Sequence, residues 1–171
     1  MRKILFVTVQ LFVSTILLAQ NEDGNQLPQR PLNSISLNML GDASAFSIQY
    51  ERLFTVTSNL FLSGKLGLGY NEEFIFCFFS PCTPEKYLTL PHHITGNIGS
   101  GRNFFEFGFG GTILYGNTTE PYFFYPMAGY RLIPLSKNKL NFRILLQVPV
   151  TGFNGHDILF SPIDLSLGFC F

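Results

Sequence analysis

Tryptophan is absent from this 171-residue chain, cysteine occurs only three times, and charged residues make up only 13% of it. Eleven basic residues balance eleven acidic ones, so the composition gives no reason to expect nucleic acid or an acidic substrate as a partner. Hydrophobic residues reach 46% and aromatic residues 16%. The chain is therefore too apolar for a disordered protein and too poor in charge for an ordinary soluble domain.

A long apolar run occurs once, at the amino terminus. Arg2 and Lys3 precede the apolar residues 4–18, and the chain turns polar directly after Ala19. This order is typical of a secretory signal peptide, and the run is shorter than the ~20 residues that a membrane-spanning helix needs. We expect a cleavable signal peptide over residues 1–19, with cleavage near Ala19.

The chain after the signal peptide lacks any further long apolar segment. Residues 20–32 are polar, with two prolines, and we interpret them as a short tether in the periplasm. Residues 33–171 form the remaining domain. If this domain lies in a membrane, it must cross it as β-strands, because in lipid only helices and closed barrels satisfy every backbone polar group.

Residues 33–171 contain successive segments in which apolar and polar side chains alternate. Phe105, Phe107 and Phe109, for example, alternate with Glu106 and Gly108, which is the period of a strand and not of a helix. Most segments are longer than soluble strands and match the ~9–11 residues of a tilted membrane strand. The eight predicted strands are 33–41, 44–54, 60–71, 87–99, 103–116, 122–134, 140–152 and 162–171.

The polar faces of these segments carry six charged residues, three of each sign. Such a set can neutralise itself inside an eight-stranded lumen, which is just wide enough for side chains to fill it. Aromatic residues on the apolar faces lie towards segment ends, as at membrane interfaces. We therefore predict an apolar exterior and a lumenal charge network of Glu51, Lys65, Glu106, Arg131, Arg143 and Asp164, with Asp164 directed to Arg131 or Arg143.

The links between the segments predict which end of the barrel faces outwards. With both termini in the periplasm, the periplasmic links 55–59, 100–102 and 135–139 are short, whereas the extracellular links 72–86 and 153–161 are longer. The first extracellular link, 41–43, is tight. Pro91, Pro126 and Pro149 fall near the extracellular ends of their strands, where we expect bulges or an irregular rim.

Several stretches carry a resemblance to a known family. The signal peptide, SIQYER at 47–52, FFEFGFGG at 104–111, PMAGYR at 126–131 and a terminal Phe171 resemble small eight-stranded outer-membrane β-barrel proteins of Gram-negative bacteria, of the OmpX and OmpA transmembrane-domain type. The resemblance covers nearly all of the mature chain. It implies an all-β fold: an eight-stranded antiparallel up-and-down transmembrane β-barrel behind a cleavable signal peptide.

The resemblance also implies location and partners. The cell outer membrane would hold the protein, its lipids would surround it, and the barrel-assembly machinery would recognise the closing strand through Phe169 and Phe171. We expect a monomeric membrane protein with a plugged polar lumen and a role in adhesion, partner contact or envelope integrity. The aromatic-rich loop 72–86 is the candidate contact for an extracellular partner.

Two other functions remain as alternatives. Some small barrels are lipid A deacylases or acyltransferases, but His92-His93-Ile94-Thr95 lacks a serine two residues after a histidine, and nucleophilic catalysis needs base and nucleophile within hydrogen-bond reach. His156-Asp157 near Ser161 is the other candidate. The third interpretation is a secreted lipocalin-like binder of a lipophilic ligand. We expect no catalytic residues, cofactor or metal.

The cysteines give little further chemistry. Cys77 and Cys82 lie in the longest loop, where an oxidising exterior could close a disulfide between them; a free pair or other partners remain open. Their spacing, without a second ligand pair nearby, is not a zinc signature. Cys170 is expected to face the lumen as a small space-filling residue.

Overall fold

The structure is a computed structural model that describes residues 30–72, 86–116, 121–135, 139–150 and 160–171. Every element in these ranges is a β-strand. No helix in the described part is long and apolar enough to cross a membrane. The strands are β1 (Asn33–Met39), β2 (Phe46–Thr55), β3 (Leu60–Glu72), β4 (Lys86–Ser100), β5 (Asn103–Tyr115), β6 (Tyr122–Leu132), β7 (Lys139–Gln147) and β8 (Ile163–Cys170).

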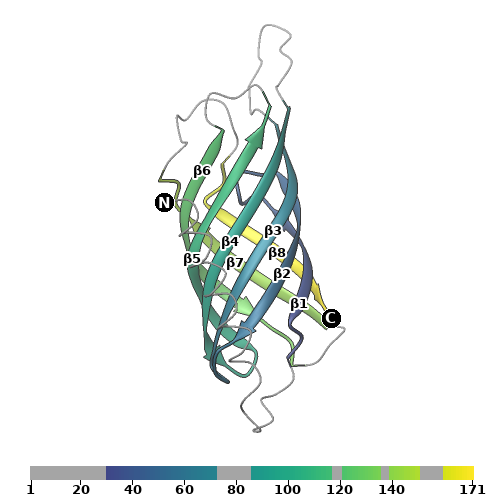
Figure 1. Ribbon diagram of the computed structural model, residues 1–171, viewed down its shortest axis with the longest axis vertical. Helices are drawn as coiled ribbons and strands as arrows, with labels where there is room; N and C mark the ends of the chain where they lie inside the picture. The colour runs from purple at the N-terminus through teal and green to yellow at the C-terminus, as the bar shows by residue number, and fades with distance from the viewer. Residues whose placement is uncertain (1–29, 73–85, 117–120, 136–138, 151–159) are drawn as a thin grey trace, which may run out of the picture.

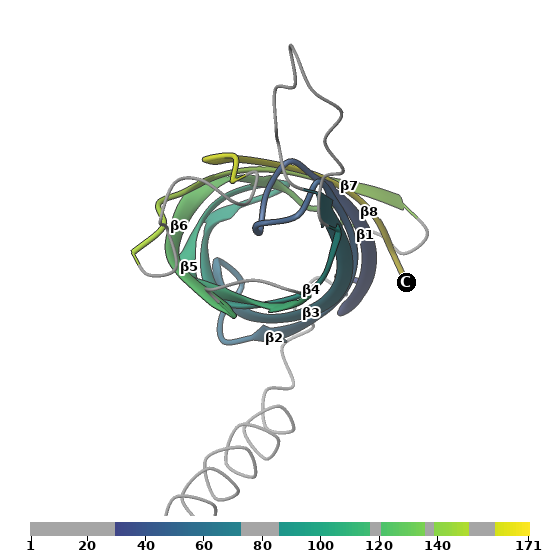
Figure 2. The same cartoon turned by 90° about the horizontal axis from the view of Figure 1, so that it is seen from above.

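The eight strands form one closed antiparallel barrel in up-and-down order, as predicted. The strands are tilted relative to the long axis of the barrel (Figure 1), and a view along the barrel shows the closed ring (Figure 2). β8 pairs with its sequence neighbour β7 and with β1, where Leu37 lies opposite Leu167 and Ser34 opposite Cys170. The amide of Phe171 also donates to the carbonyl of Asn33. Because the seam is paired, the barrel has no open edge.

Side-chain burial follows the alternation with the apolar face outwards. In β8, Ile163, Leu165, Leu167 and Phe169 are exposed, whereas Asp164 is buried. The same pattern holds around the ring, so that the exposed large hydrophobic residues come from all eight strands. The buried polar and charged residues face the lumen. This arrangement is the inverse of a soluble barrel, whose core is apolar.

The two ends of the barrel differ. We call the end with the links 40–45, 73–85, 116–121 and 148–162 the loop end, and the end with the links 56–59, 101–102 and 133–138 the terminus end, since β1 starts and β8 finishes there. An apolar cluster closes the lumen near each end. At the terminus end it contains Leu53, Phe61, Phe104 and Ile133, with Leu32 packed against it; at the loop end it contains Ala43, Leu114, Phe123, Tyr125, Met127 and Leu145.

The tether predicted before β1 is in contact with the barrel where it is described. The carbonyl of Leu32 accepts a hydrogen bond from the amide of Leu53. The guanidinium of Arg30 lies 4.7 Å from the ring centroid of Phe104. The last residues before β1 therefore cover the terminus end of the lumen, while the rest of the predicted tether lies outside the described residues.

The prolines do not produce the bulges that we expected. On either side of Pro91, Leu66 pairs with His92 and Gly69 with Thr89, so the register does not shift. Pro126 pairs in register with Phe109 of β5, and β7 ends at Gln147, before Pro149. We predicted bulges or an irregular rim. No bulge forms at Pro91 or Pro126, because a proline lacks only its own N–H. The rim is irregular, however, where the pairing of β3 with β4 is interrupted beside Pro91 and where β7 ends before Pro149.

Candidate functional site

The candidate site is the interior of the barrel, where two polar clusters lie between the apolar ends. All six residues of the predicted network have buried side chains that face the lumen: Glu51, Lys65, Glu106, Arg131, Arg143 and Asp164. They do not form one network. Four of them make an arginine–glutamate cluster towards the terminus end, and Asp164 belongs to a second cluster towards the loop end.

The arginine–glutamate cluster connects opposite walls of the barrel. Nη1 of Arg131 in β6 donates to Oε1 of Glu51 in β2 at 2.7 Å, and Nη2 of Arg131 donates to the other oxygen. Arg143 in β7 donates to the same carboxylate at 2.9 Å, and its Nε lies 2.9 Å from Oε2 of Glu106 in β5. Two guanidinium groups and two carboxylates, all of them buried, thus neutralise one another.

The register explains why both arginines need these partners. Arg131 and Arg143 lie directly opposite each other on β6 and β7, and like charges in such a pair repel. Glu51 reaches them across the lumen, with its second oxygen also accepting from the hydroxyl of Ser34. Glu106 accepts from the hydroxyl of Thr95 at 2.7 Å. The cluster is held by bonds that no single pair of neighbouring strands could supply, although Nε of Arg131 and Nη1 of Arg143 have no hydrogen-bond partner among the described residues.

The loop-end cluster is built around a residue that we did not predict. The link between β1 and β2 folds into the lumen, and Asp42 and Ala43 are fully buried. Its backbone has positive φ at Leu40 (67°), Asp42 (61°) and Ala43 (49°), a conformation that costs a non-glycine residue roughly 1–2 kcal/mol. Gly41 is required here, since a Cβ would collide with the side chain of Asp164. The turn must be held in place by its contacts.

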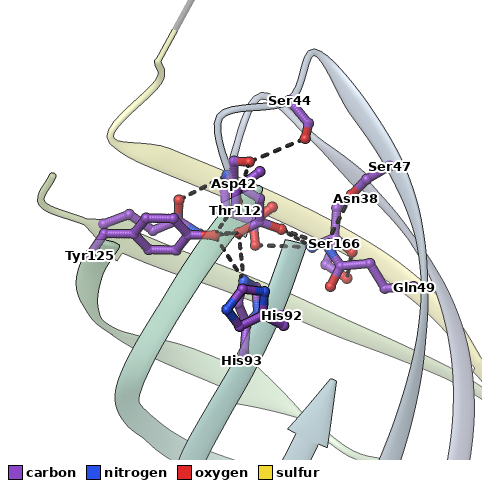
Figure 3. A network of polar contacts seen from close by, with 12 residues as sticks. Asn38, Asp42, Ser44, Ser47, Gln49, His92, His93, Thr112, Tyr125 and Ser166 are labelled. Atoms are coloured by element: carbon purple, nitrogen blue, oxygen red, sulfur yellow. Dashed lines mark hydrogen bonds and ion pairs between the residues drawn. The ribbon is translucent and has the colours of Figure 1, made fainter. Parts of the chain in front are cut away.

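The carboxylate of Asp42 supplies most of those contacts (Figure 3). Nε2 of His93 lies 2.8 Å from Oδ1, and Gln147 donates to Oδ1 at 2.6 Å. The hydroxyl of Tyr125 donates to Oδ1 at 3.3 Å. Gln49 and Asn38 donate to Oδ2. These donors come from β1, β2, β4, β6 and β7, so one carboxylate ties five strands to the turn.

The backbone of Asp42 is held as well. Its amide donates to Oε1 of Gln147 at 2.9 Å, and its carbonyl accepts from the hydroxyls of Thr112 and Ser44. Burial by itself would raise the pKa of the Asp42 carboxyl. The charge and hydrogen bond of His93, the charge of Lys65 and the hydrogen bond from Gln147 outweigh burial, and the pKa lies below its ordinary value.

Asp164 faces the lumen as predicted, but the arginine partner predicted for it is wrong. Asp164 makes no ion pair with Arg131 or Arg143; its Oδ2 accepts from Asn38 at 3.1 Å. It lies opposite Leu145 in the pairing of β7 with β8 and beside Gly41, at the height of the inward turn. The guanidinium of Arg143 is instead directed to Glu51 and Glu106. Alternation predicts which way a side chain faces but not how far along the lumen its partner lies.

The other predicted positions are placed as follows. His93 is buried in the lumen between Asp42 and Tyr125, and Cys170 is buried and accepts from Asn141. His92 faces outwards, where its Nε2 lies 3.1 Å from the hydroxyl of Tyr122. The ammonium of Lys65 has no hydrogen-bond partner among the described residues. Cys77, Cys82 and His156 lie outside the described residues.

The two clusters show that polar and charged side chains occupy the lumen. Ion pairs and hydrogen bonds cross it at both levels, and apolar side chains close each end of the described barrel. Among the described residues, no group of three His, Cys, Asp or Glu side chains could hold a metal ion. The lumen is thus a filled polar core that holds the walls together.

Fold and site together define a closed eight-stranded barrel with an apolar exterior and a charged, filled core. No family model, curated protein or solved structure matches the chain.

Proposed function

We propose that the chain is an integral outer-membrane β-barrel whose filled lumen serves stability and whose outward loops serve surface interaction or envelope integrity. The observation that carries this proposal is the inverted burial: large apolar side chains such as Ile48, Leu68 and Ile94 are 61%, 59% and 74% exposed. A water-soluble monomer rarely exposes contiguous apolar patches beyond a few hundred Å². In a bilayer the same belt removes apolar surface from water.

The aromatic residues and the links support the same placement. Tyr70, Tyr115 and Tyr122 lie near the loop end of the outer wall, and Tyr130 and Phe169 near the terminus end, as in the aromatic girdles of membrane barrels. Short turns lie at the terminus end, which would be periplasmic. The residues 1–19 would direct export, and Phe169 and Phe171 would present the closing strand to the assembly machinery.

Membrane fractionation tests this proposal most directly. The full chain expressed in a Gram-negative host should sediment with outer membranes, resist extraction by carbonate, and migrate faster on a gel when unheated than when boiled. Outward Ile144 should tolerate Phe, whereas Ile144→Arg should cost about 2–4 kcal/mol of unfolding free energy in lipid vesicles. In a soluble protein, an exposed isoleucine replaced by arginine would cost little. Native protein in the soluble fraction without detergent would refute the proposal.

The surface role rests on the link 73–85, which lies outside the described residues, together with its flanking ends Glu72 and Lys86. A partner protein that contacts the cell surface through this loop is the expected ligand. Replacing residues 73–85 by a short turn should leave heat-modifiability unchanged while it removes adhesion to host or neighbouring cells. Equal adhesion by the shortened protein would assign the role to another loop or to envelope integrity.

The alternatives have less support. A lipocalin-like binder needs an apolar cavity, whereas charged side chains fill the middle of this lumen. For a lipid-modifying enzyme, the ring nitrogens of His92 face Leu90 and Tyr122, and neither supplies a serine nucleophile. His156 remains a candidate of that alternative and lies outside the described residues.

A further inference from the structure

An apolar groove of about 650 Å³ crosses the outer wall from β2 to β6. Its floor includes Gly64 and Gly111, where missing side chains deepen the surface. Its walls carry apolar and aromatic residues: Tyr50, Phe54, Leu66, Ile94, Phe109, Tyr122 and Phe124. The paired residues Tyr50, Leu66, His92 and Gly111 form one row across β2 to β5, so the groove runs across these strands.

The groove also contains the exceptional charges of the outer wall. Among described outward-facing strand positions away from strand ends, the only basic or acidic side chains are Arg52 and His92, and both line this groove. Arg52 is exposed, and one N–H of its guanidinium donates to Asn33, the first residue of β1, at 3.0 Å. The positive charge therefore lies near the terminus end. Among the described residues, Arg52 forms no ion pair with a carboxylate.

A charge at this place needs an anionic partner. Arg52 lies opposite Gly64 in the pairing of β2 with β3, and its bond to the first residue of β1 places it towards the terminus end. In the membrane orientation proposed above, the phosphate groups of the periplasmic leaflet lie towards this end. A guanidinium binds phosphate through paired N–H groups better than any other side chain does. The hydrocarbon of the same molecule can then follow the groove over Gly64 and Ile94.

We propose that this groove is a specific site for one anionic glycerophospholipid of the periplasmic leaflet, with its phosphate at Arg52 and an acyl chain along the floor. The proposal rests on the membrane location proposed above. A second hollow of about 420 Å³, lined by Ile35, Ile48, Leu68 and Leu90, shares Tyr50 and Leu66 with the groove. It takes the second acyl chain, so that the Tyr50–Leu66 pair separates the two chains.

The upper part of the groove is shaped by the outward pair of His92 and Tyr122. A Cβ at position 111 would meet both the hydroxyl of Tyr122 and Nε2 of His92, so Gly111 is what lets the two rings lie stacked 5.7 Å apart on the wall. The pair satisfies its own polar atoms and presents ring faces to the chain. The site thus has a charge at Arg52, where a phosphate can bind, and an aromatic surface at His92 and Tyr122, where an acyl chain can pack.

Gly64 offers a clean way to close the groove. A Cβ built there meets nothing within 4 Å, so Gly64→Leu adds a side chain to the floor without a clash at its Cβ. Protein reconstituted in vesicles of equal parts phosphatidylglycerol and phosphatidylcholine, and then analysed by native mass spectrometry, should retain one phosphatidylglycerol. Gly64→Leu should lose most of this adduct while its heat-modifiability is unchanged. Ile144→Phe, on β7 outside the groove, should keep it.

Substitution of Arg52 tests whether this residue binds the lipid phosphate. Arg52→Gln should weaken retention of phosphatidylglycerol roughly tenfold or more, and Arg102→Gln, which removes the same charge at the same end outside the groove, should not. Equal retention by Gly64→Leu and wild type would mean annular lipid only and overturn the site. Preferential retention of lipopolysaccharide from the host membrane would overturn the choice of ligand. Failure of the wild type to insert would instead refute the membrane proposal itself.

Discussion

Replacing Glu51 by Gln is expected to lower the free energy of unfolding by roughly 3–5 kcal/mol, the usual cost of removing one partner from a buried ion pair. Glu51 accepts from both Arg131 and Arg143, so its loss leaves two guanidinium groups opposite each other with Glu106 as the nearest carboxylate. Gln preserves the shape and removes the charge. Because the chain has no tryptophan, urea unfolding in lipid vesicles should be followed by circular dichroism and by the gel shift.

Two further variants separate charge from hydrogen bonding at this cluster. Ser34→Ala removes one hydroxyl that donates to Glu51 and should cost only about 1 kcal/mol. The double variant Glu51→Gln with Arg131→Gln restores neutrality, so its loss should be smaller than the sum of the single losses. Additive losses, or a Glu51→Gln variant as stable as the wild type, would show that the ion pairs do not hold the walls together.

How far the sequence could predict this structure depends on what alternation encodes. The period of two in segments such as Phe105 to Phe109 predicts strands and their number, because each residue faces one of only two sides. The apolar exterior followed from the balanced charges on the polar faces and from the aromatic residues near segment ends. It also placed the seam, since the first and last strands of a closed barrel must pair. Most predicted boundaries lie within a few residues of the observed ones.

The contacts between side chains inside the lumen could not be predicted from the alternation of apolar and polar residues. Alternation assigned Asp164 to the lumen but did not say how far along the barrel axis it lies. The arginine partners that we predicted belong to the arginine–glutamate cluster, whereas Asp164 belongs to the loop-end cluster. Asp42 was missed because it lies in a link, where alternation assigns no facing to a side chain. A signal was present in Gly41, Ala43 and Ser44, small residues around an acidic one, which would fit an inward turn; their φ angles and contacts come only from the closed wall.

The second large effect is expected at that turn. Asp42→Asn keeps the size of the side chain but places an amide NH₂ among several donors and removes the charge facing His93 and Lys65. The loss should be roughly 3 kcal/mol, and the positive-φ backbone of Leu40 and Ala43 should favour release of the turn. Hydrogen exchange of amides 40–45, which should quicken far more than exchange in β5, measures the release.

The effect of Asp42→Asn on the free energy of unfolding should depend on pH. The pKa of Asp42 is lower in the folded protein than in the unfolded chain, so its stabilisation is present above the ordinary carboxyl pKa of about 4 and is lost as pH falls further. The stability difference between wild type and Asp42→Asn should therefore shrink below about pH 4. Thr112→Val, which removes only a hydroxyl donor to the Asp42 carbonyl, should cost about 1 kcal/mol. If it matched Asp42→Asn in stability and in exchange, the carboxylate would not be the group that holds the turn in the lumen.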